Sequence, residues 1–350
     1  MAKRPTILDV ARHAGVSKST VSLVLQNSAL VKDSTREKVT QSMTALNYVY
    51  NRSAAGLRGT PSGLIGLIIN DLRNPFFTEF AASAQMRFAE AGYSTVIANA
   101  DENPEIQAQV IAAMIEHGVS AFVLSPSYGG DAEAFDRIAR AGKPAMQVMR
   151  KADDRTDLFP LYAPDFAHGG ELATDHLMQL GCRSIAFVGG LEDRSVTAER
   201  MSGYYQVMAR EGATPRVLSG RPTKNFGRAV ALKFAEEPAA PEAAVCFSDL
   251  VALGMLSGFA EAGIALGRDF RLVGFDDIED AATAFPPLSS IHCGPQEIGI
   301  ETAETMLHWL DEGEKPAPER RTAVSLIARR SSLGSNEPVT PLDPRLDPPS

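Results

Sequence analysis

Groups that bind phosphate are concentrated at the start of the chain. Residues 1–60 hold nine Lys or Arg against three acidic residues, a formal charge of +6, whereas residues 61–350 carry −15. Ammonium and guanidinium groups pair with phosphate oxygens, so this distribution predicts that the first 60 residues alone contact nucleic acid. Because many charged segments are simply solvated surface, the prediction depends on a local fold that directs these groups at DNA.

Residues 6–25, TILDVARHAGVSKSTVSLVL, predict such a fold. Their apolar residues recur three and four positions apart, as they do on one face of each of two short helices. Between these helices, Gly15 can adopt the positive φ of a tight turn, and Ser17 can cap the second helix. This is the layout of a helix-turn-helix, whose second helix enters the major groove of DNA. An ordinary helical hairpin is the alternative.

A third helix and a hinge are expected next. Residues 33–46 have helical spacing, with Ser34 and Glu37 placed as a capping box. Residues 51–57 allow only two turns of helix, which are unstable alone, before Gly and Pro interrupt the chain. We therefore expect a hinge that orders only against a partner; a plain flexible linker is the alternative.

From Leu64 onward, apolar strands alternate with amphipathic helices. Continuous apolar strands joined by helices indicate parallel sheets covered on both faces, and two such series predict two doubly wound lobes. A late strand means that the chain crosses between the lobes more than once. The expected strands are 64–69, 94–98, 121–124, 144–149, 184–188, 216–219, 243–247, 270–275 and 323–328, and the expected helices are 75–91, 166–180, 196–211, 225–236, 249–262 and 295–312.

These patterns give an α/β fold with a helical amino-terminal domain. The last 17 residues contain five Pro and no aromatic residue, which indicates disorder. The expected divisions are a helix-turn-helix domain at 1–50, a hinge helix and linker at 51–62, a two-lobe domain at 63–333 and a disordered tail at 334–350.

Composition and motifs argue against several other classes of protein. No apolar run approaches the roughly 20 residues that span a bilayer, and no apolar signal segment follows MAKRPT, so we expect a cytoplasmic location and no membrane partner. The three cysteines lack metal-ligand spacing, and no nucleotide-binding, nucleophile-elbow or zinc-protease motif occurs, so no catalytic residue, cofactor or metal is expected. A sugar-active enzyme, for which His168 and His176 share a helical face, and a periplasmic sugar-binding protein remain as alternatives.

Several segments, in order along the chain, resemble the LacI/GalR family of bacterial transcription regulators. They include DVARHAGVSKSTVS, STREKV, NRSAAGLR, IGLIINDLRNPFF, HLMQLGCRSIAFVGG, FSDLVALG and VGFDD. The VSLVL and AERMSGY segments look closest to the branch that includes the maltose-regulon repressor. The resemblance implies periplasmic-binding-protein-like lobes that bind a sugar-type effector and dimerise, and a homodimer that binds a pseudo-palindromic DNA operator.

The resemblance also implies a set of DNA-binding residues. Lys18 and Ser19 match positions that read base edges, and Lys18 can donate to guanine. Leu23 stands where many relatives have Arg, so we expect apolar contact with a thymine methyl. Leu57 matches a minor-groove wedge, although packing within the dimer or against the lobes is an alternative. The expected phosphate contacts are Thr6, Ser17, Thr20 and Ser22. Asn51 and Ala54 of the hinge are also expected to bind DNA.

The effector is expected between the lobes, at the carboxyl ends of the strands. Asp276 comes at the end of a strand, where its carboxylate can accept two hydroxyl groups, and Arg200 matches the ligand-binding arginine of the family. The other expected contacts are Asn74, Ser125, Phe226 and Ser248.

The chain departs from the family pattern at some effector positions. Met149 stands where several relatives have Asp, and Phe166 replaces a frequent Asn. Cys293 and Pro295 occupy positions at which some relatives contact ligand. These departures leave open which metabolite binds, whether it is a sugar or a non-sugar, and whether it acts as an inducer or a co-repressor.

Overall fold

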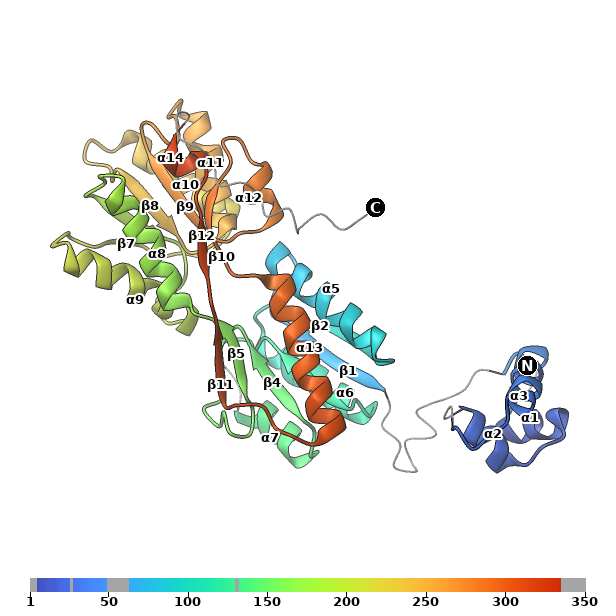
Figure 1. Cartoon of the computed structure of the whole chain (residues 1–350). Helices are drawn as coiled ribbons and strands as arrows, with labels where there is room; N and C mark the ends of the chain where they lie inside the picture. The colour runs from blue at the N-terminus through green and yellow to red at the C-terminus, as the bar shows by residue number, and fades with distance from the viewer. Residues whose placement is uncertain (1–4, 26–27, 49–62, 130–131, 335–350) are drawn as a thin grey trace. The chain divides into compact units, whose positions relative to one another are not determined.

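The computed structural model describes residues 5–25, 28–48, 63–129 and 132–334 (Figure 1). The chain divides into two compact units, Met1–Ser62 and Gly63–Ser350. The predicted hinge and all of the predicted tail after Gly334 lie outside the described residues.

The described residues of the first unit form three helices, α1 (Ile7–Ala14), α2 (Lys18–Leu25) and α3 (Asp33–Ala45). Gly15 ends α1 with φ 69°, as the turn requires. The Ser17 hydroxyl accepts the Thr20 N–H at 3.0 Å and so caps α2, as predicted. The buried side chains shared by the three helices are Val10, Ala11, Val21, Val24, Val31 and Val39.

The predicted capping box of α3 is wrong. The helix begins at Asp33, after the extended residue Lys32, so Ser34 already lies within the first turn and cannot be the N-cap. A related interaction is found instead at α1, where the Asp9 carboxylate accepts the backbone N–H of Thr6 at 2.9 Å.

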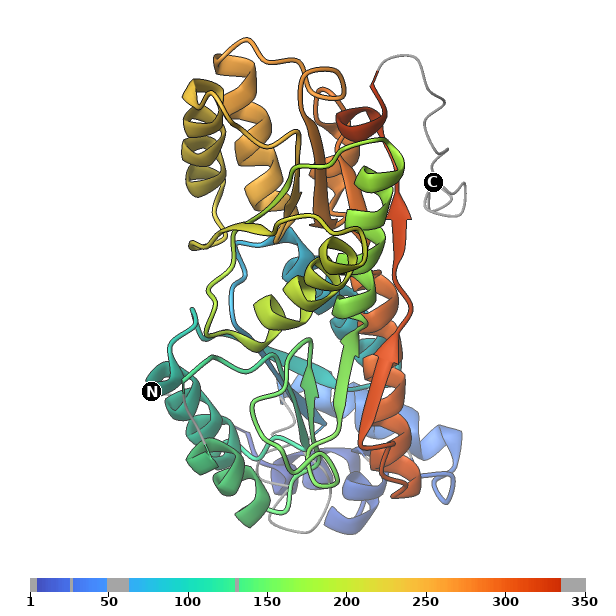
Figure 2. The ribbon, with the colours of Figure 1, turned by 90° about the vertical axis from the view of Figure 1, so that its left-hand side faces the viewer.

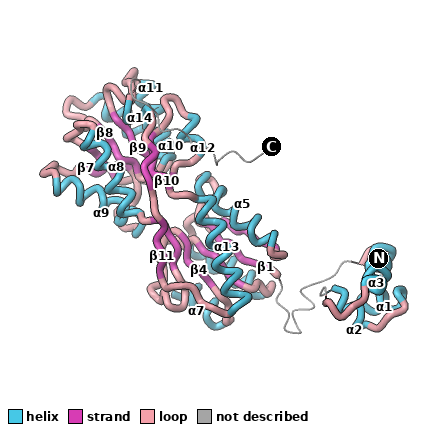
Figure 3. Tube along the Cα trace, in the orientation of Figure 1, coloured by secondary structure: helices cyan, strands magenta, loops and turns pink. Residues whose placement is uncertain are grey.

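The described part of the second unit contains two six-stranded sheets. The amino-terminal lobe has strand order β11-β5-β4-β3-β1-β2, and all neighbouring strands are parallel. Side chains from α5 and α13 pack on one face of this sheet, and side chains from α6 and α7 pack on the other. Figure 3 distinguishes the helices, strands and loops of the chain by colour. The bounds are β1 (Leu64–Ile69), α5 (Pro75–Glu90), β2 (Ser94–Asn99), α6 (Pro104–Glu116), β3 (Ala121–Leu124), α7 (Ala132–Arg140), β4 (Ala145–Val148), β5 (Leu161–Pro164), α13 (Pro295–Glu312) and β11 (Glu319–Thr322).

The carboxy-terminal lobe has strand order β12-β10-β9-β8-β6-β7. The edge strand β12 is antiparallel to β10, and the other neighbouring strands of this sheet are parallel. Helices α8 and α9 cover one face, and α10 and α11 cover the other. The bounds are α8 (Phe166–Gln179), β6 (Ile185–Val188), α9 (Ser195–Arg210), β7 (Arg216–Leu218), α10 (Lys224–Glu236), β8 (Ala243–Cys246), α11 (Asp249–Glu261), β9 (Arg271–Asp276), α12 (Glu279–Thr283), β10 (Ser289–His292), β12 (Ser325–Ile327) and α14 (Arg330–Leu333).

Three connections join the lobes in the described chain: β5 to α8, β10 to α13, and β11 to β12. The first and third run side by side in Figure 2, because β5 pairs with β11. The predicted repeated crossing is therefore confirmed. Each lobe has its own sheet, and these three connections link the two lobes covalently. The lobes can therefore move relative to each other by bending at these connections.

Glycines bring α8 and α9 into close contact. A Cβ on Gly170 would overlap the carbonyl oxygen of Arg200, and a Cβ on Gly203 would overlap that of Ala167. Only hydrogen fits between the two backbones at these points. This contact fixes the turn of α9 that carries Arg200 and therefore sets where its side chain lies.

Candidate functional site

One side of α2 is exposed and carries most of the predicted base-reading residues. Lys18, Ser19, Ser22 and Leu23 border one hollow of the surface. Lys18 and Ser19 are exposed, whereas Leu23 is half-buried against the helical core. The hollow thus has an ammonium group, two hydroxyls and one apolar side chain, which can contact base edges, phosphate oxygens and a thymine methyl respectively.

The other predicted phosphate contacts differ in how available they are. The hydroxyls of Ser17, Ser19 and Thr20 form one cluster, with Ser17 Oγ 2.7 Å from Ser19 Oγ and 2.8 Å from Thr20 Oγ1. Thr6 donates its hydroxyl to the Asp9 carboxylate at 2.6 Å, so it must break this bond to donate to a phosphate. Asn51, Ala54 and Leu57 lie outside the described residues.

A cavity of about 400 Å³ lies between the lobes of the second unit. Its volume falls within the range of small-molecule sites. The segments that line it follow β1, β2, β4, β6, β8 and β9, so the carboxyl ends of both sheets face it. Among the residues that line it are Asn70, Asp71, Arg73, Asn74, Phe76, Phe77, Asp101, Glu102, Tyr128, Met149, Arg150, Phe166, Arg194, Thr197, Arg200, Arg221, Phe247, Ser248 and Asp276.

A buried ion pair lies in the wall of this cavity. Arg200 donates to Asp276 at 2.9 Å, and both side chains are about 5% exposed. Arg200 also donates to the carbonyl of Phe247. Burial raises the pKa of Asp276 to about 6, although Arg200 and a hydrogen bond from Asn74 both favour the ionised form.

Aromatic rings surround the Arg200 guanidinium. Its central carbon lies 4.7 Å from the ring centroids of Phe166 and Phe247 and 3.9 Å from that of Phe275. The negative ring faces stabilise the charge in a place from which water is largely excluded. The position Phe166, where the family often has Asn, thus helps to hold the arginine.

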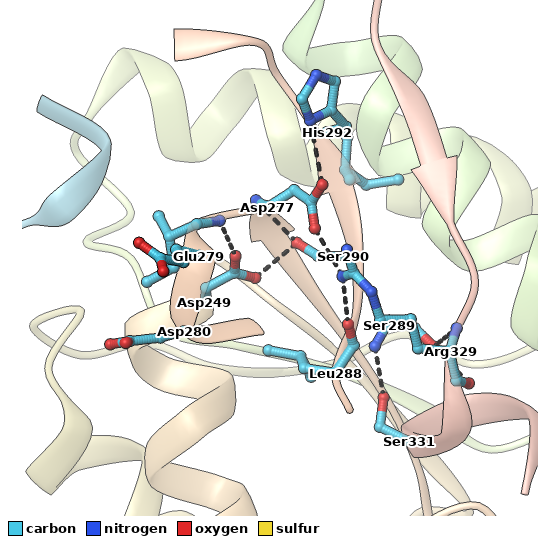
Figure 4. A network of polar contacts seen from close by, with 12 residues as sticks. Asp249, Asp277, Glu279, Asp280, Leu288, Ser289, Ser290, His292, Arg329 and Ser331 are labelled. Carbon is cyan, nitrogen blue, oxygen red and sulfur yellow. Dashed lines mark hydrogen bonds and ion pairs between the residues drawn. The ribbon is translucent and has the colours of Figure 1, made fainter. Parts of the chain in front are cut away.

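A polar network supports the segment that carries Asp276 (Figure 4). Asp249 accepts Ser290 Oγ at 2.6 Å and the N–H of Ile278 at 2.9 Å. Asp277 accepts Arg329 at 2.6 Å and contacts His292 Nδ1 at 3.1 Å, and these partners lower its pKa despite burial. Asp277, which follows Asp276 in sequence, and Asp249, which holds the Ile278 N–H, therefore fix the carboxyl end of β9 before any ligand binds.

Tyr128 links the two lobes at the cavity. Its ring centroid lies 4.0 Å from the guanidinium carbon of Arg150 of the amino-terminal lobe and 4.7 Å from that of Arg194 of the carboxy-terminal lobe. Its hydroxyl oxygen accepts the N–H of Val196 at 3.4 Å. Arg150 is also paired with Glu102 at 2.9 Å.

The structure brings four of the six predicted effector residues to the cavity. Asn74 caps α5 by accepting the Phe76 N–H at 3.1 Å, and Ser248 precedes α11 with its buried hydroxyl oxygen unpartnered within the described chain. Together with Arg200 and Asp276 they line the cavity.

Ser125 and Phe226, the other two predicted effector residues, do not line the cavity. Ser125 is fully buried and donates to Asn70 Oδ1 at 2.7 Å, which makes it a support for a cavity residue. The Phe226 ring packs over Gly220 and the core beneath α10.

Several cavity residues escaped sequence reasoning. The expected strand 243–247 includes Phe247 as its last residue, but β8 ends at Cys246 and Phe247 is the first residue beyond it. Tyr128, Arg150 and Arg194 also come after the carboxyl ends of strands. Their position after a strand is the sequence signal that could have identified them as cavity residues. Of the residues at which the chain departs from the family pattern, Met149 and Phe166 line the cavity, whereas Cys293 and Pro295 are buried and do not.

Two sequence profiles match the chain. Residues 6–51 match the profile described as bacterial regulatory proteins, lacI family. Residues 174–332 match a periplasmic binding protein-like domain. The transcriptional repressor PurR of Actinobacillus pleuropneumoniae is 30% identical over 95% of this chain and 99% of its own length. The chain belongs to the lacI family of bacterial regulatory proteins.

Other comparisons agree with this membership. The maltose regulon regulatory protein MalI of Escherichia coli is 28% identical over 94% of this chain and 99% of its own length. A maltose-regulon relative is thus among the matches, as expected, but its identity is similar to that of the purine repressor. A lac repressor dimer bound to operator and the anti-inducer ONPF covers 95% of this chain and 100% of its own, with 27% identity and a TM-score of 0.83.

The chain is therefore a DNA-binding transcriptional regulator with an effector-binding domain. The predicted α/β class, with a helix-turn-helix followed by two doubly wound, periplasmic-binding-protein-like lobes, is confirmed. No helix among the described residues is both long and apolar enough to cross a bilayer.

Proposed function

We propose that this regulator represses carbohydrate-metabolism genes as a cytoplasmic homodimer. Residues 1–50 bind the operator, and residues 63–333 bind the effector and dimerise, while the predicted hinge at 51–62 and the segment after Gly334 lie outside the described residues. The observation that carries this proposal is the Arg200–Asp276 pair, which is buried in the wall of a cavity lined by both lobes. The protein binds its effector without converting it.

In the proposed complex, α2 enters the major groove of DNA. Lys18 donates to guanine, Ser19 contacts a neighbouring base edge and Leu23 contacts a thymine methyl. Hydroxyls of the same helix and of Thr6 contact phosphates and fix its position along the duplex. Asn51, Ala54 and Leu57 contact the minor groove from the hinge.

In the cavity, the effector binds Arg200, Asp276, Ser248 and Asn74. Because the cavity is lined from both lobes, an occupant changes the equilibrium between open and closed lobes by its different affinity for the two states. A ligand that favours the DNA-binding state is a co-repressor, and one that favours the other state is an inducer.

The operator contact is tested with Lys18→Ala in the full chain. A high-affinity duplex is first selected from random sequence with the wild-type protein, and affinity is then measured by fluorescence anisotropy. We expect Lys18→Ala to lose about 1–3 kcal/mol of binding to the selected duplex, and much less with random duplex, because only base contacts carry sequence information.

Lys38→Ala is the matched control. It removes one positive charge, as Lys18→Ala does, but from α3, where Lys38 is exposed. The residues that border the hollow on α2 stay unchanged. Lys38→Ala should weaken binding to the selected and the random duplex by the same amount. Equal losses for the two variants on both duplexes would contradict base reading by Lys18.

A further inference from the structure

We propose that the effector is an acid, a sugar carboxylate or a sugar phosphate, whose negative group is bound by the arginines of the cavity. This inference depends on the proposed function and specifies the chemical class of the ligand. It rests on which hydrogen-bonding groups of the cavity are already occupied and which are not.

The charges of the cavity do not cancel. Among the described residues that line it, five arginines face four acidic residues. Each of the four carboxylates already has an arginine partner: Asp71 and Asp101 pair with Arg73, Glu102 pairs with Arg150, and Asp276 pairs with Arg200. Each of these carboxylates is thus neutralised by an arginine and has fewer acceptor sites left for the hydroxyl protons of a neutral sugar than an unpaired carboxylate would have.

Two arginines have no acid partner inside the cavity. Arg221 is exposed at the cavity and has no ion pair with any described residue. Arg194 pairs with Asp193 at 3.4 Å, but Asp193 is 70% exposed and does not line the cavity. Their guanidinium groups, on the carboxy-terminal lobe, have no carboxylate partner inside the cavity and can therefore bind a carboxylate or phosphate of a ligand.

Buried donors without partners add to this excess. Within the described chain, Arg150 Nε, Arg200 Nε and Ser248 Oγ are buried and unpartnered, and the three residues are at most 8% exposed. All three line the cavity. A buried N–H or O–H without a partner is unfavourable, and an anionic oxygen can accept it without offering a proton in return.

Helix geometry points in the same direction. Ser248 precedes the 13-residue helix α11, and its hydroxyl does not cap the first-turn N–H groups. The first turns of α5 and α9 also border the cavity, through Phe76, Phe77 and Val196. The positive ends of these helices favour a negative group in the space between them.

Calorimetry on the full chain tests the inference with matched probes. The probes are glucose and galactose, each with its aldonate, its uronate and its 6-phosphate, at one ionic strength. We expect at least one acidic form to bind about tenfold or more tightly than its neutral parent, as charge-assisted hydrogen bonds allow. The aldonate, uronate and phosphate arms distinguish a carboxylate from a phosphate ligand.

Variants assign the binding to the cavity. Arg221→Gln should weaken binding of the acidic form about tenfold and leave the neutral form unchanged. Arg140→Gln is the control, because Arg140 is exposed on α7, has no ion pair among the described residues and does not line the cavity. Arg194→Gln should repeat the effect of Arg221→Gln.

Three results would overturn the inference. They are tighter binding of the neutral parents, no binding of any acidic probe, and equal binding of the acidic probe by wild type and both cavity variants. Operator affinity is measured on the same samples. Operator binding combined with a preference for neutral sugars would reject only the acidic effector, whereas no preference for any duplex would reject the proposed function itself.

Discussion

Asp276 shows how a single buried carboxylate can make stability depend on pH. Burial raises its pKa from 3.8 to about 6 in the folded chain. Between these two values the folded state holds a proton that the unfolded state has released. Stability from this residue is therefore greatest below pH 4 and falls as the pH rises toward 6, after which it stays constant.

The change Asp276→Asn tests this sign. The difference in free energy of unfolding, wild type minus Asp276→Asn, should fall from pH 4 to pH 7 in denaturant titrations at a series of pH values. Other titrating groups are shared by both proteins and cancel in the difference. A flat or rising difference would show that Arg200 holds the Asp276 pKa at or below its ordinary value.

Individual residues also show where sequence reasoning reached its limit. Asp276 and Arg200 were predicted, and they lie at the cavity, because a carboxylate at a strand end and a matching arginine are both visible in sequence. Ser125 also follows a strand, but its side chain points beneath the cavity to Asn70. Whether a side chain at the end of a strand points into the cavity or beneath it depends on neighbours that are distant in sequence.

At the scale of elements, the close packing of α8 on α9 carries a prediction for Gly203→Ala. The new Cβ would overlap the Ala167 carbonyl and push apart the helices that position Arg200. We expect a loss of about 1–3 kcal/mol in the free energy of unfolding, together with weaker effector binding.

Ser202→Ala is the control for this change. Ser202 is the preceding residue of α9 and is exposed, and its hydroxyl donates to the Glu199 carbonyl of the same helix. Chemical denaturation of both variants makes the comparison. If Gly203→Ala and Ser202→Ala had the same free energy of unfolding, the proposed close contact between α8 and α9 would be wrong.

Elements differ in how visible they are in sequence. Apolar runs such as LIGLII predicted β1 within its observed bounds, because a strand buried on both faces must be apolar throughout. The strands β10 and β11, SSIH and ERRT, carry no such signal and were not predicted. The edge strand β11 is mostly exposed. In β10, the hydroxyls of Ser289 and Ser290 donate to the Arg329 carbonyl and the Asp249 carboxylate.

At the scale of the whole molecule, effector and operator must influence each other equally. If the effector changes operator affinity by some factor, the operator must change effector affinity by the same factor, and typical factors are about 5–150. The measurement is a pair of titrations on the full chain, operator with and without saturating effector, and effector with and without saturating operator. We expect the two ratios to agree within error.

Lys18→Ala separates this linkage from a direct effect of DNA on the cavity. The variant loses operator affinity through α2, which belongs to the unit Met1–Ser62, whereas every cavity residue belongs to the unit Gly63–Ser350. At operator concentrations that saturate only the wild type, effector affinity of the variant should therefore match that of the DNA-free protein. If operator changed the effector affinity of the variant as much as that of the wild type, DNA would act on the second unit without binding α2. Coupling through binding of operator to α2 would then be wrong.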